Sequence, residues 1–468
     1  MDADLTAQIG QSELEVAVRD DWLRASQRVF LNWKVPMRRY RGLKVAGIVA
    51  VGALAVAGCS RSTVGGPGGT SVPTTVLSSP STSLSGSTTT VVRATTAVQP
   101  TSSMTTAEGA TFTWSSLPSA ELGGRWHGAS AWTGKELVVW GGVNRSVDHV
   151  VSAMSDGAAF DPALGTWRSI ASAPAGLADS VQAAAWSGDE LVVVANGVQT
   201  AASQGARYRP ASDSWLPMAP SPLGSRSSAA SVWTGGELLV VGGEESQSLS
   251  EPTALAYSPS SDTWRSVATP DFVPRRSVAL VWTGKIVVAV GLTEMCSEPG
   301  PCTHLAPALA SYDPATDAWT HGPADGLGPP DAPTYVYGFV RSAGWDGSSV
   351  VVTLRAPDRV LAIDPARLTA TTGAPPACAA TAATGKFDVP PILAGERLAW
   401  ICPDGSVEGA SGDLTSWTKL AAGPTSPQPV SEPVLRWTGR DLLLWGGLAQ
   451  VTFNPTTDTG LRLTMARS

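Results

Sequence analysis

Charge and histidine are both scarce in this chain. Charged residues make up 15% of its 468 residues, and 39 acidic against 32 basic side chains leave a formal net charge of −7. A nucleic-acid-binding protein needs clustered Lys and Arg to neutralise phosphates. The basic residues here are scattered, so we expect no nucleic-acid partner. The four histidines show no metal-ligating spacing such as i, i+4, and we expect neither a metal nor a cofactor.

Long apolar runs are almost absent as well. The single clear run, residues 45–57, is shorter than the roughly 20 residues that a spanning helix needs, and the lack of a second run excludes a multi-span membrane protein. A basic block at residues 38–44 precedes it, as in a signal peptide. The run leads into the tetrapeptide VAGC, whose last residue is Cys59. This tetrapeptide resembles a bacterial lipobox, which implies cleavage before Cys59 and a diacylglycerol on its thiol.

An uncleaved membrane anchor over residues 37–59 is the alternative to a lipoprotein signal peptide. Both interpretations predict an extracytoplasmic chain tethered to the cell membrane. Residues 1–36 precede Met37, where a usual signal peptide would begin. We interpret them as the product of a start codon assigned too early, with a short cytoplasmic tail as the alternative. Residues 60–110 are rich in Ser, Thr, Pro and Gly, a composition that buries too little apolar surface to offset its ordering entropy. It predicts a disordered stalk.

Glycine and proline, by contrast, are abundant, and a repeat explains where many of them lie. With 48 Gly and 36 Pro, long helices are excluded. Beyond residue 110 a Trp-x-Gly turn recurs about every fifty residues, usually followed by the β-branched or Leu-rich run typical of a buried strand. The turns begin at Trp132, Trp186, Trp233, Trp282, Trp345 and Trp437, with a degenerate copy at Leu393. The chain therefore contains seven repeat units.

A second signal lies downstream of the turn in the first four units. There an aromatic residue precedes a Trp by a constant interval, and a dipeptide ending in Pro opens a turn between them. The pairs are Phe160 and Trp167, Tyr208 and Trp215, Tyr257 and Trp264, and Tyr312 and Trp319. Each unit is therefore predicted to form a four-stranded antiparallel sheet.

The combination of a diglycine, an aromatic residue and a later Trp resembles the kelch repeat. The diglycine is kept at Gly141-Gly142, Gly242-Gly243 and Gly446-Gly447. The resemblance extends over residues 111–463. It implies an all-β fold, a seven-bladed kelch-like β-propeller similar to the central domain of galactose oxidase.

The two ends of this region predict how the ring closes. The last unit has Phe453 at the aromatic position, but Gly460 stands where the Trp should follow. The missing Trp is found instead at Trp114, before the first complete unit. We expect an N-terminal strand around Trp114 to complete the last blade; the alternative is that residues 111–118 are only a linker.

Four cysteines remain once Cys59 is assigned to the lipid. In an extracytoplasmic protein an even number predicts disulfides. Three pairings are possible, and proximity in sequence favours Cys296 with Cys302 and Cys378 with Cys402. Neither pair has the two-to-four-residue spacing of zinc motifs.

Candidate binding residues follow from the loops and from the arginines. In a four-stranded blade, the connection from the second to the third strand shares a face with the connection to the next blade, and these are the long connections here. Long loops on a rigid scaffold often carry function. Arginines near the innermost strands either hydrogen-bond carbonyls of neighbouring blades or form a basic rim that recognises anionic or sugar ligands. The candidate set is Arg125, Arg226, Arg276, Glu244, Glu245, Asp331 and Tyr335.

Folding accounts for the recurrent residues, which favours a non-catalytic function. We expect a surface-anchored scaffold that binds an envelope protein or a glycan. The alternative is a carbohydrate-active or other hydrolase or isomerase, in which carboxylates such as Glu432 would meet near the ring axis. The copper chemistry of galactose oxidase is not expected, because most tyrosines of the repeat region occupy its aromatic position and no cysteine is spare.

Overall fold

The computed structural model describes residues 111–466 with gaps at 147, 149, 175–176, 178–180, 197–202, 223, 225, 228, 246–253, 297–301, 329–338, 356–357, 380–386, 396, 425–429 and 450–455. The segments predicted at 1–36, 37–59 and 60–110, with Cys59, lie outside the described residues. Among the residues that are described, no helix is long and apolar enough to cross a membrane.

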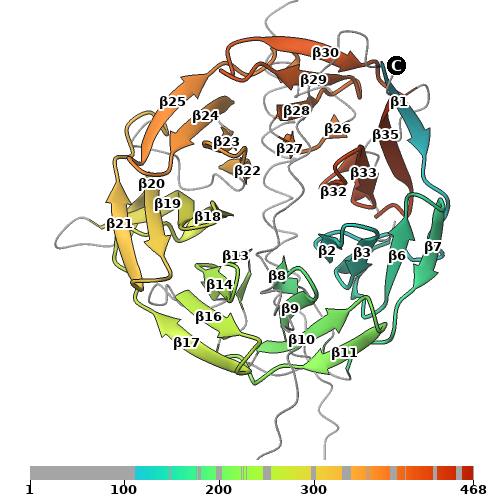
Figure 1. Ribbon diagram of the computed structural model, residues 1–468, viewed down its shortest axis with the longest axis horizontal. Coiled ribbons are helices and arrows are strands. Elements are labelled where there is room, and N and C mark those ends of the chain that lie inside the picture. Colours follow the sequence, from blue (N-terminus) through green and yellow to red (C-terminus); the bar gives the residue numbers. More distant parts are fainter. Residues whose placement is uncertain are drawn as a thin grey trace, which may run out of the picture. The chain divides into compact units, whose positions relative to one another are not determined.

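Seven four-stranded antiparallel sheets form the blades of a β-propeller, as predicted (Figure 1). From the innermost strand outward, blade 1 is β2 (Ala129–Trp132), β3 (Leu137–Trp140), β6 (Gly157–Asp161) and β7 (Thr166–Ser169); blade 2 is β8 (Val181–Trp186), β9 (Leu191–Asn196), β10 (Ser203–Arg209) and β11 (Ser214–Pro217); blade 3 is β13 (Ala230–Trp233), β14 (Leu238–Val241), β16 (Ala254–Ser258) and β17 (Thr263–Val267).

The remaining blades have the same order. Blade 4 is β18 (Arg276–Trp282), β19 (Val287–Cys296), β20 (Cys302–Asp313) and β21 (Ala318–Gly322); blade 5 is β22 (Val340–Trp345), β23 (Val350–Leu354), β24 (Arg359–Asp364) and β25 (Thr369–Gly373); blade 6 is β27 (Ile392–Ala394), β28 (Arg397–Ile401), β29 (Val407–Ala410) and β30 (Trp417–Ala421); blade 7 is β32 (Val434–Trp437), β33 (Asp441–Trp445), β35 (Gly460–Ala466) and β1 (Thr111–Ser116).

The N-terminal strand closes the ring, which confirms the expectation for Trp114. Strand β1 pairs antiparallel with β35, and Trp114 stands opposite Leu463. One detail differs from the sequence interpretation: Leu463, not Phe453, occupies the aromatic position of this blade. Strand β35 also continues to Ala466, past the boundary expected at residue 463. Leu463 lacks the aromatic ring that marks this position in the first four units.

The second strand of each blade forms the core. All residues of β3, β14, β23 and β33 are buried, because each face of a blade packs against a neighbour. A strand covered on both faces reads as a continuous apolar run, and each fully buried aliphatic side chain contributes about 1.5–3 kcal/mol. The predicted aromatic pairs lie directly across the outer two strands, with ring centroids 5.0 Å apart for Tyr312 and Trp319.

The Trp-x-Gly turn needs its glycine. Gly134 has a φ of 91° and follows Thr133, whose N–H donates to the carbonyl of Glu136. Only glycine adopts such a φ without strain, and this turn joins the innermost strand of blade 1 to the second strand.

A repeated ionic contact ties blades 1 and 3 to the blades that follow them. In blade 3 the Arg265 guanidinium donates from Nε and Nη2 to the two carboxylate oxygens of Glu237, at 3.0 and 2.7 Å. It also reaches blade 4, where Nη1 lies 2.9 Å from Asp317 Oδ1 and Nη2 lies 3.0 Å from the Tyr312 hydroxyl. Arg168 and Glu136 of blade 1 form the equivalent bidentate pair.

The tyrosine of each contact is held in its protonated form. Tyr208 donates its hydroxyl proton to Asp213 Oδ1 at 2.7 Å, and Tyr312 donates to Asp317 in the same way. Burial, reinforced by the hydrogen bond to the aspartate, raises the pKa of both Tyr208 and Tyr312 to about 12.

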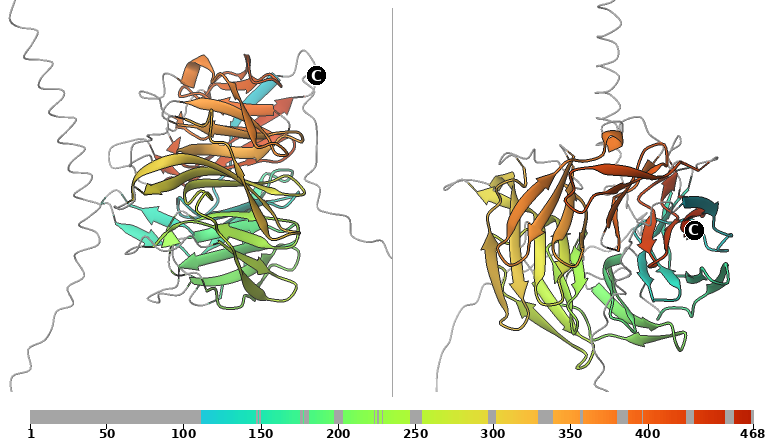
Figure 2. Two further views of the ribbon diagram at one scale, coloured as in Figure 1. Left: turned by 90° about the vertical axis from the view of Figure 1, so that its left-hand side faces the viewer. Right: turned by 45° about the horizontal axis from the view of Figure 1, so that its top comes forward.

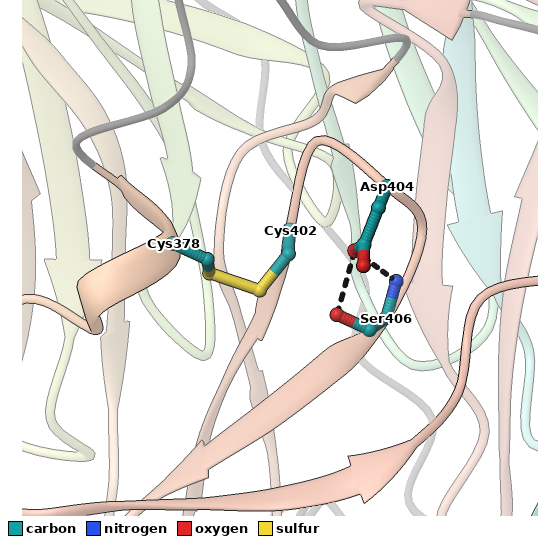
Figure 3. The surroundings of a disulfide bond; sticks show 4 residues. All are labelled: Cys378, Cys402, Asp404 and Ser406. Carbon is teal, nitrogen blue, oxygen red and sulfur yellow. Dashed lines mark hydrogen bonds between the residues drawn. A yellow bond between two sulfur atoms is a disulfide. The ribbon is translucent and has the colours of Figure 1, made fainter.

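One predicted disulfide is present among the described side chains. Cys378 lies in a single 3₁₀ turn after blade 5, and Cys402 directly follows β28 of blade 6; their Cα atoms are 5.6 Å apart (Figure 3). The turn after Cys402 is held by Asp404, whose Oδ1 accepts from Ser406 N and Oγ at 2.8 and 2.6 Å. The bridge therefore joins the blade 5 to blade 6 connection to a rigid turn. The backbones of Cys296 and Cys302 stand opposite each other in β19 and β20; their side chains lie outside the described part.

Candidate functional site

Extra strands rise from the connections between the second and third strands of several blades. Blade 1 carries the ribbon β4 (Val143–Arg145) and β5 (Val151–Ala153), and in blade 4 strands β19 and β20 continue as a long hairpin. Both project to the same side of the ring (Figure 2). Short segments also pair on this side. In blade 3, β12 (Arg226–Ser227) pairs with β15 (Glu244–Glu245), and in blade 7, β31 (Val430–Ser431) pairs with β34 (Leu448–Ala449). Strand β31 also pairs with β26 (Phe387–Asp388), which precedes blade 6, so this pair joins two blades. We call this side the long-loop face.

Arg125 is the predicted site residue with the fullest description, and it is buried. Its exposed fraction is 1%. The guanidinium donates to the carbonyls of Gly123, Gly141 and Asp156 at 3.0–3.2 Å, and Nη1 lies 2.9 Å from Asp156 Oδ1. Arg125 thus holds backbone carbonyls, but those of its own blade rather than of neighbouring blades.

The other predicted site residues are only partly placed. In the β12–β15 pair, Arg226 stands opposite Glu245, and Ser227 opposite Glu244. This register brings three of the predicted residues to one ribbon, whose side chains lie outside the described part. Arg276 begins β18, opposite Leu292. Asp331 and Tyr335 lie outside the described residues.

A cluster that the sequence did not predict lies where blade 7 meets blade 1. His127 Nε2 is 2.9 Å from Glu432 Oε2, and the two side chains remain 58% and 52% exposed. Both residues have left-handed backbones, with φ of 54° and 53°, and each precedes the Trp of its own Trp-x-Gly turn by the same interval. Equivalent positions on adjacent blades thus face each other across the closure of the ring.

Aromatic and cationic groups surround this pair. The Trp126 ring stacks on the His127 imidazole with centroids 4.2 Å apart, and the Arg145 guanidinium lies 5.3 Å from the Trp126 centroid, within the range of a cation–π contact. The hydrogen bond from His127, with the positive charges of Arg355 and Arg145, holds the pKa of Glu432 below its usual range. Glu432 is therefore a carboxylate at neutral pH. We call His127, Glu432, Trp126 and Arg145 the seam cluster.

Backbone hydrogen bonds fix the seam cluster to both blades. Trp126 and Val143 exchange N–H···O bonds of 3.0 Å, which attach the β4–β5 ribbon to the segment before β2. Asn144 Nδ2 donates to the Gly124 carbonyl and to Thr456 Oγ1, at 2.6 and 2.8 Å. Because Thr456 belongs to the β34–β35 connection of blade 7, these bonds hold the β4–β5 ribbon of blade 1 against blade 7.

The β4–β5 ribbon also exposes apolar side chains. Val150 and Val151 are 59% and 53% exposed. The far edge of β4 bonds Trp126 and Thr456, whereas among the described strands β5 pairs with β4 alone. Among the described residues the remaining large apolar side chain with such exposure is Leu164, at the β6–β7 turn. That turn joins the third and fourth strands and lies on the opposite face from the ribbon.

One group of potential metal ligands occurs among the described residues. The ligand atoms of Cys378, Cys402 and Glu408 gather within 4.8 Å. The two sulfurs are joined in the disulfide and cannot act as thiolate ligands, so this group does not form a metal site while the bridge is intact.

The seam cluster could have been suspected from the repeat. His127 and Glu432 hold the same place in the first and last units, and closure of the ring makes those units neighbours. Taken one at a time, neither residue carries a local signal, because the contact depends on the closure of the ring.

A match to a family model agrees with the architecture. A family model described as Kelch motif matches residues 225–270, which lie in blade 3 and the segment before it. No curated protein matches the chain. Among solved structures, one described as "Structure of YjhT" is similar, with 14% sequence identity, 61% of this chain and 96% of that chain covered, and a TM-score of 0.39. Together with the seven blades, the family match identifies the fold as a kelch-type β-propeller.

Proposed function

We propose that this protein is a non-catalytic interaction scaffold, tethered outside the cytoplasm, that binds a partner protein through the long-loop face beside the seam cluster. The observation that carries the proposal is the β4–β5 ribbon. It places two exposed valines and the outer edge of β5, which has no partner among the described strands, close to Trp126 and Arg145 of the seam cluster. Trp and Arg are enriched in protein interfaces, exposed apolar patches mark interaction sites, and an open strand edge accepts a further strand.

The ionic network elsewhere is consistent with a scaffold role. Arg125, Arg168 and Arg265 are engaged in holding carbonyls, carboxylates and neighbouring blades together. These charges stabilise the ring. The long-loop face, by contrast, carries side chains that the ring itself does not need, because the ribbon stands outside the four-stranded sheet of blade 1.

A matched pair of variants tests this proposal. The double substitution Val150→Glu, Val151→Glu should abolish capture of a partner from envelope extracts by cross-linking. Leu164→Glu places the same charge on an exposed apolar site of the same blade, at the opposite face, and should leave capture unchanged. Melting temperatures close to that of the parent protein would show that both variants fold. Equal capture by all three proteins, or capture lost only with Leu164→Glu, would contradict the proposal.

The second candidate is a hydrolase or isomerase acting on carbohydrate, and the His127–Glu432 contact is the observation that favours it. A histidine held by a carboxylate is a common general base. The pair is more than half exposed, whereas catalytic pairs are usually desolvated. Turnover of envelope glycans by the parent protein, lost in Glu432→Gln, would support catalysis over the scaffold.

A further inference from the structure

The innermost strands of the seven blades contain basic residues and no acidic ones. The basic residues are Arg276, Arg341 and Arg436. Arg341 has a partner in Asp358, which lies between β23 and β24. Its Nη1 atom is 3.7 Å from Asp358 Oδ1. Arg436 differs, because the acceptors of its guanidinium are both backbone carbonyls.

Arg436 occupies a position that is apolar everywhere else in the ring. It immediately precedes the Trp of the Trp-x-Gly turn. The equivalent residues of the other six units are Ala131, Ala185, Val232, Val281, Gly344 and Ile392. The fold therefore accepts a small or aliphatic residue at this place and does not require a charge.

The guanidinium bridges two blades at their inner edges. Nη1 donates to the Leu435 carbonyl at 2.7 Å, and Nη2 donates to the Ser130 carbonyl of β2 at 3.0 Å. Leu435 and Ser130 are equivalent residues of neighbouring innermost strands. Among the described strands, each such strand pairs with one neighbour only, and its other edge faces the ring axis (Figure 1). In an extended strand the N–H and C=O of one residue point to the same edge. The N–H groups of Leu435 and Ser130 therefore face the same side as the guanidinium.

The same junction between blades 2 and 3 is made without charge. There the Ser231 hydroxyl accepts from the Ala184 N–H and donates to the Ala184 carbonyl, both at 3.1 Å. Ser231 is the counterpart of Ser130, and Ala184 is the counterpart of Leu435. A neutral hydroxyl suffices to join two inner edges. Joining the two blades therefore does not by itself require the positive charge of Arg436.

Burial makes the unbalanced charge costly. Nearby protein atoms desolvate the guanidinium of Arg436, and this desolvation lowers its pKa. The side chain nevertheless keeps partial contact with solvent. Nη2 of Arg125 is an example of a nitrogen that is both buried and without a hydrogen-bond partner, and no nitrogen of Arg436 is in that state. A desolvated cation that still has free donors open to solvent is stabilised by an anion.

We propose that Arg436, with the backbone N–H groups of Ser130 and Leu435, forms a binding site for a small oxyanion at the ring axis between blades 7 and 1. The ligand class is phosphate, sulfate or a carboxylate. Each offers several oxygen acceptors to a guanidinium fork and backbone donors. The site is separate from the long-loop face and does not depend on the proposed scaffold role.

Thermal unfolding of the full chain tests the site. Sodium phosphate, sulfate, acetate and chloride are compared at pH 7 and constant ionic strength. Phosphate or another oxyanion should raise the melting temperature progressively, because a ligand that binds only the folded state stabilises it in proportion to the logarithm of its concentration. Arg436→Met should remove this response while folding normally, since the equivalent residues are apolar. Arg440→Met removes an exposed arginine from the same blade and should respond as the parent does.

Line broadening of the phosphate ³¹P signal by the parent protein, absent with Arg436→Met, gives a second readout that does not depend on melting. Three results would overturn the proposal. One is an identical anion response in Arg436→Met and the parent. Another is no response of the parent to any oxyanion. The third is stabilisation by chloride equal to that by phosphate, which would indicate general charge screening.

Discussion

Trp114 and Leu463 stand opposite each other in the outermost strand pair of blade 7, although they come from the two ends of the folded region. The Trp114 ring packs against the buried cluster that includes Leu463, Leu442 and Leu435. The first and last strands are thus joined by ladder hydrogen bonds and by a shared apolar contact. Without β1, the edge of β35 would be open and the ring would depend on contacts between blades alone.

Trp114→Ala should lower stability by about 2 kcal/mol, below the roughly 3–5 kcal/mol of a fully buried aromatic because Trp114 is only partly buried. Chemical denaturation followed by tryptophan fluorescence measures the change. Leu164→Ala, at a side chain that is 73% exposed, is the matched control and should change stability by less than about 0.5 kcal/mol. A further variant that lacks residues 111–118 should melt lower still, and a parent-like melting temperature would refute the role of β1.

Tyr312→Phe should change how stability responds to alkali. The pKa of Tyr312 is raised to about 12, against about 10 in an unfolded chain. Above pH 10 the unfolded chain loses the proton while the folded protein keeps it, so the stabilisation present below pH 10 declines as the pH rises toward 12. Melting temperatures between pH 9 and 12 should fall less steeply for Tyr312→Phe than for the parent. Phe160, at the equivalent position of blade 1, shows that the fold accepts a ring without the hydroxyl. Parallel pH profiles for the two proteins would contradict this assignment.

The fold could be predicted from the sequence because the repeat encodes it locally. Each Trp-x-Gly turn specifies a tight connection and each aromatic–Trp pair specifies two adjacent strands, so seven units dictate seven blades. The third strand of the last blade is harder to predict, because it has Leu463 where the first four units have an aromatic residue. Its identity follows only from pairing with Trp114, which is a contact between distant parts of the chain.

The candidate sites could not be predicted in the same way. The charge of Arg125 makes it a candidate in the sequence. The carbonyls that its guanidinium contacts are brought to it only by the folding of the loops of blade 1. The His127–Glu432 contact exists only because closure brings the first and last units together. Arg436 could have been noticed as the one charged residue at a position that is otherwise apolar. Its bridging contact to Ser130 again spans the closure.

Cys59→Ser should abolish lipid labelling of the protein and move it from the membrane fraction to the soluble fraction. The reason is that the thiol of the lipobox cysteine carries the diacylglycerol in the class of proteins that the VAGC tetrapeptide resembles. Metabolic labelling with a tagged fatty acid, followed by fractionation, measures both effects. The double variant Cys378→Ser, Cys402→Ser should remain labelled. Membrane retention of Cys59→Ser would favour the uncleaved anchor over residues 37–59.

Removing the Cys378–Cys402 bridge should destabilise the propeller without changing its fold. The bridged residues are 24 apart in sequence, and the chain-entropy estimate for a loop of that size is about 3.5 kcal/mol. The double variant Cys378→Ser, Cys402→Ser should show this loss in a denaturation series, together with a far-ultraviolet circular dichroism spectrum like that of the parent.

Reduction of the parent provides the complementary measurement, with the second predicted pair as an internal comparison. Peptide mapping without reductant should find Cys378 linked to Cys402 and Cys296 linked to Cys302. The second bridge would close a much shorter loop and should contribute less, on the order of 2.5 kcal/mol. Because Cys402 is almost fully buried, the Cys378–Cys402 bridge should resist mild reductant unless the blade 6 turn opens. Free thiols at Cys378 and Cys402 in the exported protein, or unchanged stability of the double serine variant, would show that the bridge does not hold blade 6 in place.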